Sequence, residues 1–359
     1  MRRIALLFSL IVYSTSTWAQ MPSAPAPAAP AAEKHLRNIR QLTFGGDNAE
    51  AYWSPNSKWL TFQSNNAAWG LHCDQIFAME LKKAANNKNY RPLNISNGKG
   101  RTTCSYFMPD NKHIIFASTV SGADTCPPTP ELRKGGKYLW PIYDSYDIYM
   151  ADLNGKITKR LTNSPGYDAE AVLSPKGDKI LFTSTRSGDL ELWTMNLDGT
   201  GLKQITFDLG YDGGAFFSRD GSKIVFRASR PKTAEEIKEY RELLQQGLVA
   251  PTNMEIYTCN ADGSNLHQVT QLGKANWAPF FHPSGKKIIF SSNHHSTRGY
   301  DFQLYMINED GTGLEAITSE SIFNSFPMFS PDGKKIAWSS NRNNGGTRDT
   351  NVFVADWVD

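Results

Sequence analysis

The sequence lacks the features that mark several common protein classes. Its 38 lysines and arginines nearly balance its 35 aspartates and glutamates, which argues against nucleic acid as the main partner. The apolar run from Ile4 to Val12 is too short to span a bilayer, so no membrane span is predicted. No Gly-x-Ser-x-Gly and no His-Glu-x-x-His motif occurs, so the sequence assigns no catalytic residues.

Patterns that bind metals are also scarce. His294 and His295 are adjacent, and the alternation of a strand would point them in opposite directions. The turns NLDGTG, NADGSN and NEDGTG resemble the start of a calcium loop, but none has the glutamate that this loop needs at its twelfth position. We therefore predict no metal site and no cofactor.

The first residues have the pattern of an export signal. Two arginines precede the apolar run, and small residues up to Ala19 follow it, which predicts a signal peptide over residues 1–19. Residues 20–37 contain the tract PSAPAPAAPAA, which predicts an extended linker. The pattern indicates an exported protein.

One pattern recurs six times along the rest of the chain. Each copy is a pair of short strands joined by a turn of the Ser-Pro-x-Gly type, in which proline presets φ and glycine permits a positive φ. In every copy the second strand carries an aromatic residue: Phe62, Phe116, Phe182, Phe226, Phe290 and Trp338. A third strand carries another: Phe77, Tyr149, Trp193, Tyr257, Tyr305 and Phe353. Each unit has about the length of a propeller blade.

These repeats predict an all-β fold, a six-bladed β-propeller of four-stranded antiparallel blades. A small residue or proline lies two positions before the large apolar residue that precedes each turn, as in Ala51 and Trp53. The first strands can therefore converge on one axis while the large side chains fill the space between sheets. The expected blades cover residues 50–96, 103–162, 168–206, 213–270, 277–318 and 324–359.

The last copy has only three strands, and its fourth is expected from the N-terminal side. Residues 40–43 repeat the pattern of residues 203–206 in the third blade. We therefore predict that residues 38–43 complete the last blade and close the ring, which removes an open sheet edge.

Two blades carry insertions between their second and third strands. Blade 2 inserts residues 120–145, and blade 4 inserts residues 230–253. The second insertion predicts a short amphipathic helix with Thr233 and Glu236 as a capping box and Gly247 as its stop. Its buried side is expected to carry Ile237, Leu243 and Leu244. Both insertions should lie on one rim of the ring, where insertions often build a binding face.

The repeats resemble those of the TolB-like β-propeller family. The shared pattern is Ser-Pro-Asp-Gly-Lys-Lys-Ile followed by an aromatic residue, with Asn-x-Asp-Gly turns and a Gln-Ile-Thr fourth strand, and it covers residues 38–359. The resemblance implies a six-bladed propeller of the periplasm. The chain lacks the α/β domain that precedes the propeller in TolB, so binding of the peptidoglycan-associated lipoprotein is not implied. Propellers of this type also include enzymes and partners of peptidases.

Uneven polar residues around the mouth of the ring are the candidate binding site. The candidate ligand-binding residues are Glu50, Tyr167, Asp168, Glu170, Arg186, Tyr211, Asp212, Arg230, His294 and Arg342. One interpretation is a polar funnel that holds a cation, a peptide end or a sugar. The other is structural: such side chains tie down crossing loops, and the arginines pair with Asp168 or Asp212.

The four cysteines divide into two kinds. Cys73, Cys104 and Cys126 are expected near the rim of blades 1 and 2, and pairing is the default in an exported protein. We predict one disulfide, between Cys126 and either Cys73 or Cys104. Cys259 takes a strand position that methionine occupies in other copies, which predicts a buried free thiol.

Taken together, these features favour a monomeric, non-catalytic propeller of the periplasm that binds or scaffolds. Its expected partner is an envelope protein or peptide, with a glycan as a further ligand class. Two alternatives stay open at this point: a propeller enzyme of the hydrolase or lyase kind, and a regulatory propeller that works with a separate peptidase.

Overall fold

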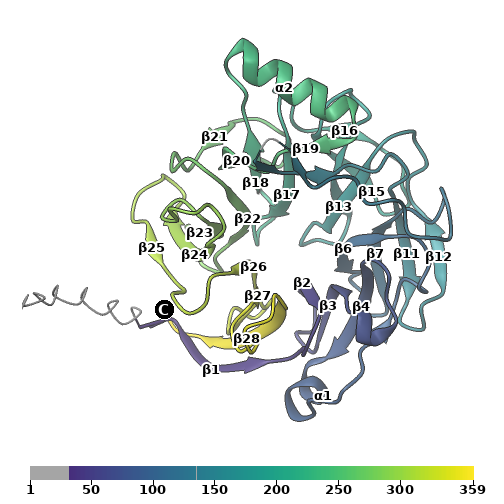
Figure 1. Cartoon of the computed structure of the whole chain (residues 1–359), viewed down its shortest axis with the longest axis vertical. Helices are drawn as coiled ribbons and strands as arrows, with labels where there is room; N and C mark the ends of the chain where they lie inside the picture. Colours follow the sequence, from purple (N-terminus) through teal and green to yellow (C-terminus); the bar gives the residue numbers. More distant parts are fainter. Residues whose placement is uncertain (1–31, 135) are drawn as a thin grey trace, which may run out of the picture. The chain divides into compact units, whose positions relative to one another are not determined.

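The computed structural model describes residues 32–134 and 136–359, so the predicted signal peptide over residues 1–19 lies outside the described residues. Six four-stranded antiparallel sheets surround one axis, and the first strand of each sheet lies nearest the centre (Figure 1). The prediction of a six-bladed β-propeller is confirmed. In the part of the chain that the structure describes, none of the helices has the length and apolar character of a membrane span.

The first three blades follow one another along the chain. Blade 1 consists of β2 (Asp47–Trp53), β3 (Trp59–Asn65), β4 (Gln75–Glu80) and β5 (Leu93–Asn94). Its connections contain the 3-10 helix η1 (Ala67–Trp69) and the short helix α1 (Leu81–Asn86). Blade 2 consists of β6 (Thr102–Phe107), β7 (His113–Ser118), β11 (Asp147–Asp152) and β12 (Ile157–Arg160). Blade 3 consists of β13 (Asp168–Leu173), β14 (Lys179–Ser184), β15 (Glu191–Asn196) and β16 (Lys203–Gln204).

The last three blades complete the ring. Blade 4 consists of β17 (Asp212–Phe217), β18 (Lys223–Ser229), β20 (Met254–Asn260) and β21 (His267–Gln268). Blade 5 consists of β22 (Asn276–Phe281), β23 (Lys287–Ser292), β24 (Gln303–Asn308) and β25 (Glu315–Ala316). Blade 6 consists of β26 (Asn324–Phe329), β27 (Lys335–Ser340), β28 (Asn351–Trp357) and β1 (Leu36–Gln41).

The recurring aromatic residues form one cross-strand pair in the middle of every blade. The pairs are Phe62–Phe77, Phe116–Tyr149, Phe182–Trp193, Phe226–Tyr257, Phe290–Tyr305 and Trp338–Phe353. The second-strand member of each pair is completely buried. Burial of side chains of this size contributes about 1.5–3 kcal/mol each, so the same contact stabilises all six sheets.

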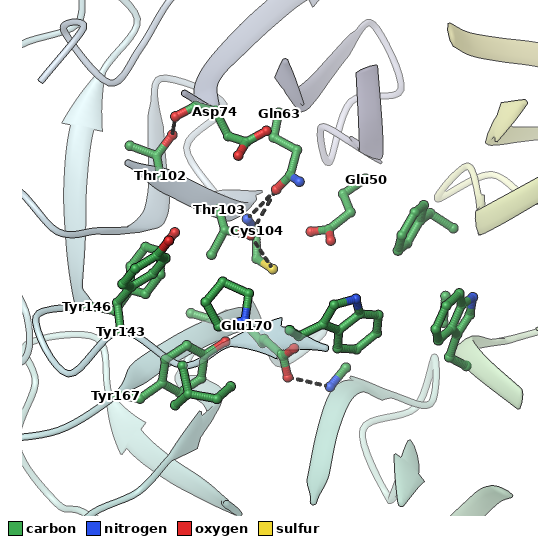
Figure 2. Close-up of a pocket in the computed structure, with 18 of the residues that line it drawn as sticks. Glu50, Gln63, Asp74, Thr102, Thr103, Cys104, Tyr143, Tyr146, Tyr167 and Glu170 are labelled. Atoms are coloured by element: carbon green, nitrogen blue, oxygen red, sulfur yellow. Dashed lines mark hydrogen bonds between the residues drawn. The ribbon is translucent and has the colours of Figure 1, made fainter. Parts of the chain in front are cut away.

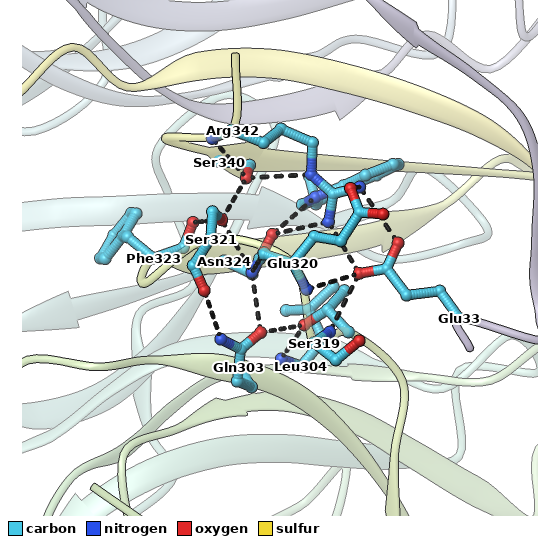
Figure 3. Close-up of polar contacts among 12 residues, drawn as sticks. Glu33, Gln303, Leu304, Ser319, Glu320, Ser321, Phe323, Asn324, Ser340 and Arg342 are labelled. Atoms are coloured by element: carbon cyan, nitrogen blue, oxygen red, sulfur yellow. Dashed lines mark hydrogen bonds and ion pairs between the residues drawn. The ribbon is translucent and has the colours of Figure 1, made fainter. Parts of the chain in front are cut away.

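The ring closes through β1, as predicted. Leu36 pairs with Trp357 and Gln41 pairs with Phe353 in an antiparallel register. The closing segment begins earlier than expected, because Glu33 already forms an ion pair with Arg342 and accepts hydrogen bonds from the backbone of residues 319 and 320 (Figure 3). Residues 33–37, which were expected in the linker, therefore belong to the closing segment, and the buried carboxylate of Glu33 anchors that segment to blade 6.

The two insertions meet above blade 3. The insertion of blade 2 forms a hairpin of β8 (Arg133–Lys134) and β9 (Lys137–Tyr138) and then β10 (Trp140–Pro141). The insertion of blade 4 forms α2 (Ala234–Gln245) and β19 (Leu248–Val249). Strands β10 and β19 pair with each other as a small two-stranded sheet. The expectation that both insertions gather on one rim is confirmed.

Helix α2 has the predicted capping box of Thr233 and Glu236. Its packing is looser than expected, since none of its side chains is fully buried. Leu244 and Tyr240, rather than the full set of three expected aliphatic residues, pack on the apolar cluster beneath the insertions. The helix therefore supports the rim from outside the ring (Figure 1).

Cys73 and Cys126 form a disulfide, which confirms the predicted bond and selects one of its two alternatives. The bond ties the blade 2 insertion to the loop before β4. Cys259 is buried and free, as predicted, and Cys104 is the other free thiol of the described residues.

Candidate functional site

Each first strand has a β-bulge at the same place, and this bulge builds the site. The pairing of every first strand with its second strand shifts register near the middle of the strand. The bulged residue has a positive φ of 45–58° in all six blades: Glu50, Cys104, Glu170, Gly214, Ala278 and Phe326. All six residues line one cavity at the mouth of the channel. A bulge re-aims the residue that it contains, so one residue per blade is turned toward the axis.

The six bulged residues share one backbone conformation but differ in the chemical nature of their side chains. A positive φ is costly for residues with a side chain such as glutamate or phenylalanine, so its occurrence in six blades marks a property of the scaffold. Blades 1 to 3 contribute two carboxylates and a thiol, whereas blades 4 to 6 contribute a hydrogen, a methyl group and a phenyl ring. The cavity therefore has a polar half and an apolar half.

The cavity has a volume of about 320 Å³. Its wall is rich in aromatic residues from the blades and from the blade 2 insertion: Tyr52, Tyr138, Trp140, Tyr143, Tyr146, Tyr167, Tyr211, Phe216, Trp277 and Phe326. Trp140 stacks on Trp277 with 5.0 Å between ring centroids, and Trp277 stacks on Phe302 at 4.4 Å. The insertion of blade 2 thus forms part of the cavity wall (Figure 2).

Glu170 has four hydrogen-bond and ion-pair partners in the cavity. Its carboxylate accepts hydrogen bonds from Thr183 Oγ1 at 2.8 Å, the Gly214 backbone at 2.7 Å and Tyr211 Oη at 2.8 Å. It also forms an ion pair with Arg227 at 2.5 Å. Burial raises the pKa of Glu170, but the charge of Arg227 and these hydrogen bonds outweigh it and lower the pKa below the usual value. Glu170 is therefore an ionised, fully engaged carboxylate.

Arg227 belongs to β18 and crosses to the bulge of the neighbouring blade. Its guanidinium also contacts the ring of Tyr211, with 4.8 Å to the centroid, and that of Trp140, at 5.3 Å. A second ion pair, between Arg101 and Asp74, lies at the blade 1 side of the cavity. Both arginines that line the cavity are thus already matched by a carboxylate.

Glu50 differs from the other two carboxylates because no arginine or lysine pairs with it among the described residues. Its Oε2 atom is buried and has no hydrogen-bond partner in that part of the chain. Burial raises the pKa of Glu50 to about 7; a hydrogen bond from Cys104 opposes this, while the charges of Glu170 and Asp74 add to it. The carboxyl group points into the cavity beside Cys104 (Figure 2).

The thiol of Cys104 is not poised as a nucleophile. Burial, together with the negative charges of Glu50 and Glu170, raises its pKa well above the ordinary value of a thiol. Nucleophilic cysteines need a lowered pKa. Cys104 is therefore a neutral thiol, and its Sγ atom lies 3.4 Å from the hydroxyl of Thr103.

The structure brings four of the ten sequence-predicted mouth residues together in the cavity: Glu50, Tyr167, Glu170 and Tyr211. The other six do not line it: Asp168, Arg186, Asp212, Arg230, His294 and Arg342.

The excluded residues lie where neighbouring blades cross. Arg186 pairs with Asp168 through hydrogen bonds of 2.8 and 2.9 Å and lies over the ring of Phe182. Arg230 pairs with Asp212 in the same way. These pairs occupy one position of the repeat in different blades, which is the arrangement expected of scaffold.

The remaining two excluded residues have equivalent local partners. Arg342 contacts Glu33 and Asn324, and His294 shares a hydrogen bond with Ser292 at 2.8 Å. Their side chains contribute to blade contacts rather than to the cavity.

Several cavity residues are absent from the predicted set, chiefly Arg227, Asp74, Arg101 and Trp140. Strand alternation places Arg227 on one face of its strand, but it does not indicate that the side chain contacts Glu170 of the neighbouring blade. One signal was available: the bulged residue comes two positions after a polar residue that begins or lies near the start of each first strand, namely Asn48, Thr102, Asp168, Asp212, Asn276 and Asn324. Glycine at this position in blade 4 indicates a close approach of another group.

No three histidine, cysteine, aspartate or glutamate side chains are grouped as a metal site would require within residues 32–134 and 136–359. The rings of His294 and His295 are 5.7 Å apart and use different partners, Ser292 and Tyr305.

Comparisons with known proteins agree with this architecture. A family model described as the TolB beta propeller domain matches residues 142–243. A structure named as a TolB from Agrobacterium tumefaciens superposes with a TM-score of 0.57 at 19% identity, over 89% of this chain and 97% of that one. TolB from Acinetobacter baumannii gives 0.52 at 19% identity, over 77% of this chain and 55% of that one.

An enzyme shares the fold as well. Oligogalacturonate lyase from Vibrio parahaemolyticus superposes with a TM-score of 0.52 at 13% identity, over 88% of this chain and 79% of that one. Likeness at this identity concerns the fold and carries no residue roles across. The six closed sheets form a six-bladed β-propeller whose fold is similar to that of TolB, and residues 142–243 match the TolB propeller model.

Proposed function

We propose that this protein is an exported binding propeller of the periplasm that holds a segment of a protein or peptide in the cavity at the channel mouth. The export signal over residues 1–19 and the TolB-like fold support the location. The cavity supports the activity, since concave, aromatic-rich sites with a few placed polar groups are the usual form of a ligand site.

One observation carries the proposal: three cavity-lining side chains have buried polar atoms without a partner in the described part of the chain. Glu50 Oε2 is an acceptor, and the Nε atoms of Arg101 and Arg227 are donors. Buried polar groups are normally satisfied. A peptide offers N–H donors and carbonyl acceptors at close spacing and could satisfy both kinds.

A cavity-filling variant tests this function. Ala278→Phe places at the blade 5 bulge the residue that blade 6 carries at its own bulge, Phe326, with a φ of 56° against 49° at Ala278. The backbone therefore accommodates phenylalanine there. We expect the protein to retain members of an immobilised random tetrapeptide library and the variant, with an unchanged circular dichroism spectrum, to lose them. Retention of no peptide, or equal retention by the variant, would contradict the proposal.

A second candidate is a glycan-cleaving enzyme of the hydrolase or lyase kind. It is favoured by the contrast between Glu50, with a pKa of about 7, and the ionised Glu170, because carboxyls with separated pKa values can divide acid and base roles. Glu170 is less suited to a base role, since it is held by Arg227 and three hydrogen bonds. Turnover of oligosaccharides that Glu50→Gln abolishes would favour the enzyme over the binding protein.

A further inference from the structure

The charges around the cavity do not balance. Five charged side chains line it: Glu50, Asp74, Arg101, Glu170 and Arg227. Asp74 pairs with Arg101, and Glu170 pairs with Arg227. When Glu50 is ionised, the cavity therefore carries one net negative charge, located on the carboxylate that lacks a counter-ion.

The geometry around Glu50 indicates what kind of group is missing. Its Oε2 atom is a buried acceptor without a partner in the described part of the chain, and no lysine or arginine there pairs with the carboxyl group. A guanidinium prefers two parallel hydrogen bonds to a carboxylate, whereas an ammonium acts as a point charge that needs one. The buried Oε2 atom by itself is sufficient for an ammonium.

The surroundings of Glu50 also suit an organic cation better than a metal ion. The rings of Tyr52, Trp277 and Phe326 line the same cavity, and aromatic faces attract ammonium groups. Calcium requires six to eight oxygen ligands, while the other two carboxylates that line the cavity are occupied by arginines. An alkyl chain that ends in an ammonium would place its carbon atoms on the apolar half and its charge on the polar half.

We infer that the cavity binds a primary ammonium group, either a lysine side chain or the amino terminus of a peptide, with the Glu50 carboxylate as its counter-ion. This inference rests on the proposed binding function and adds the chemistry of the group that is recognised. The two sources share the ammonium, and the test below separates them.

Binding of an ammonium should be linked to the loss of a proton from Glu50, so the affinity should depend on pH. The groups that act on Glu50 are Cys104, Glu170, Asp74 and Arg227, together with the adjacent Tyr52. In the free protein the pKa of Glu50 is about 7, raised first by burial. A bound ammonium favours the ionised carboxylate, so affinity should fall roughly tenfold per pH unit well below 7 and rise with pH until the amine of the ligand itself loses its proton, at about 8 for an amino terminus and about 10 for a lysine side chain.

Calorimetric titration of the protein with two probes tests the inference. Nα-acetyl-lysine methylamide carries only a side-chain ammonium, and glycyl-glycinamide carries only an amino-terminal one. We expect one of them to bind at about pH 7, where both probes are mainly protonated, and its N-acetylated counterpart to bind at least tenfold more weakly. Titrations near pH 6 in buffers of different ionisation enthalpy should show proton release on binding.

Two variants define the site. Glu50→Gln keeps the shape of the side chain and removes the charge, so it should weaken the binding at least tenfold and abolish the proton release. Glu242→Gln makes the same change on an exposed residue of α2 outside the cavity, and it should bind like the parent. Glu50→Asn provides a second test in case glutamine disturbs the bulge, because asparagine tolerates a positive φ.

The outcomes separate this inference from the function beneath it. If neither ammonium probe binds while tetrapeptides are still retained and Ala278→Phe still releases them, the ammonium inference is wrong and the binding function stands. Equal binding of an acetylated probe, or of the Glu50→Gln variant, also overturns it. If no tetrapeptide is retained either, both proposals are wrong.

Discussion

Gly214 leaves the space that the guanidinium of Arg227 occupies: a methyl group on Gly214 would overlap the Nη1 atom of Arg227. The absence of a side chain at this one bulge lets Arg227 cross to Glu170 of the neighbouring blade, while the Gly214 backbone donates a hydrogen bond to the same carboxylate at 2.7 Å. The polar half of the cavity therefore depends on a missing side chain in blade 4.

Gly214→Ala should destabilise the protein more than an ordinary substitution of a glycine with positive φ. The matched control is Gly285→Ala, where φ is 70° and nothing lies within 4 Å of the added carbon, against a φ of 57° at Gly214. The control should cost about 1 kcal/mol from backbone strain, and Gly214→Ala about 3 kcal/mol or more because Arg227 must also move. Urea unfolding of both variants measures the difference, and equal losses would show that Arg227 is not confined by Gly214.

The Glu170–Arg227 ion pair should show strong coupling in a double-mutant cycle. Arg227→Met leaves a buried carboxylate without its counter-ion, and Glu170→Gln leaves the buried guanidinium unmatched, so each single variant should lose roughly 3–5 kcal/mol of stability. The double variant removes both charges and should lose less than the sum of the two losses. Additive losses would indicate that the two charges do not stabilise each other.

Glu50 should make stability depend on pH. Its folded pKa of about 7 lies above the ordinary value of 4.5, so the folded protein binds the proton more tightly than the unfolded chain does. The stabilising contribution of this proton is fully present below pH 4.5 and is lost as pH rises toward 7. Because the cavity opens to solvent, the total loss should be about 1–3 kcal/mol.

Glu50→Gln isolates this effect from other titrating groups. The variant cannot lose the proton, so its stability relative to the parent should increase between pH 5 and pH 8. Chemical denaturation at both pH values provides the comparison. A difference between parent and variant that stays constant with pH would mean that the Glu50 pKa is not raised.

The closing strand should contribute a large part of the thermal stability. A chain that begins at Phe44 loses β1, the ion pair of Glu33 with Arg342, and the Thr43 hydroxyl that accepts a hydrogen bond from the Val352 backbone at 2.9 Å. It also leaves β28 as an open edge. Scanning calorimetry should show a melting temperature lower by about 10 °C or more.

A chain that begins at Ala32 serves as the control for this truncation. It keeps every contact of Glu33 and β1 that the structure describes, so it should melt like the parent. If both truncated chains melt like the parent, the N-terminal strand does not hold the ring closed.

Much of the architecture follows from the sequence. The six-fold recurrence of a turn, a second-strand aromatic and a third-strand aromatic predicts the number of blades and the cross-strand pairs, because strand alternation with a period of two sends these residues to one face. The similarity of residues 40–43 to residues 203–206 predicts the closing strand in the same way. These features are local or repeated, and so they can be read along the chain.

The composition of the site was decided by the tertiary structure. A bulge inserts one residue into the first strand and breaks the alternation there, so Glu50 and Glu170 point into the cavity while Asp168, two positions before Glu170, stays at the blade crossing. The same bulge turns Cys104 toward the cavity, and the disulfide forms between Cys73 and Cys126 instead.

The contact of Arg227 with the neighbouring blade is a feature that could not be predicted from the order of residues along the chain. Glu170 and Arg227 are 57 residues apart in sequence, and they meet only because the ring places two blades side by side and Gly214 leaves room between them. The repeats by themselves determined the ring, since they recur at regular spacing. Contacts between blades decided which charged side chains in the cavity have a counter-ion. They also left Glu50 without one.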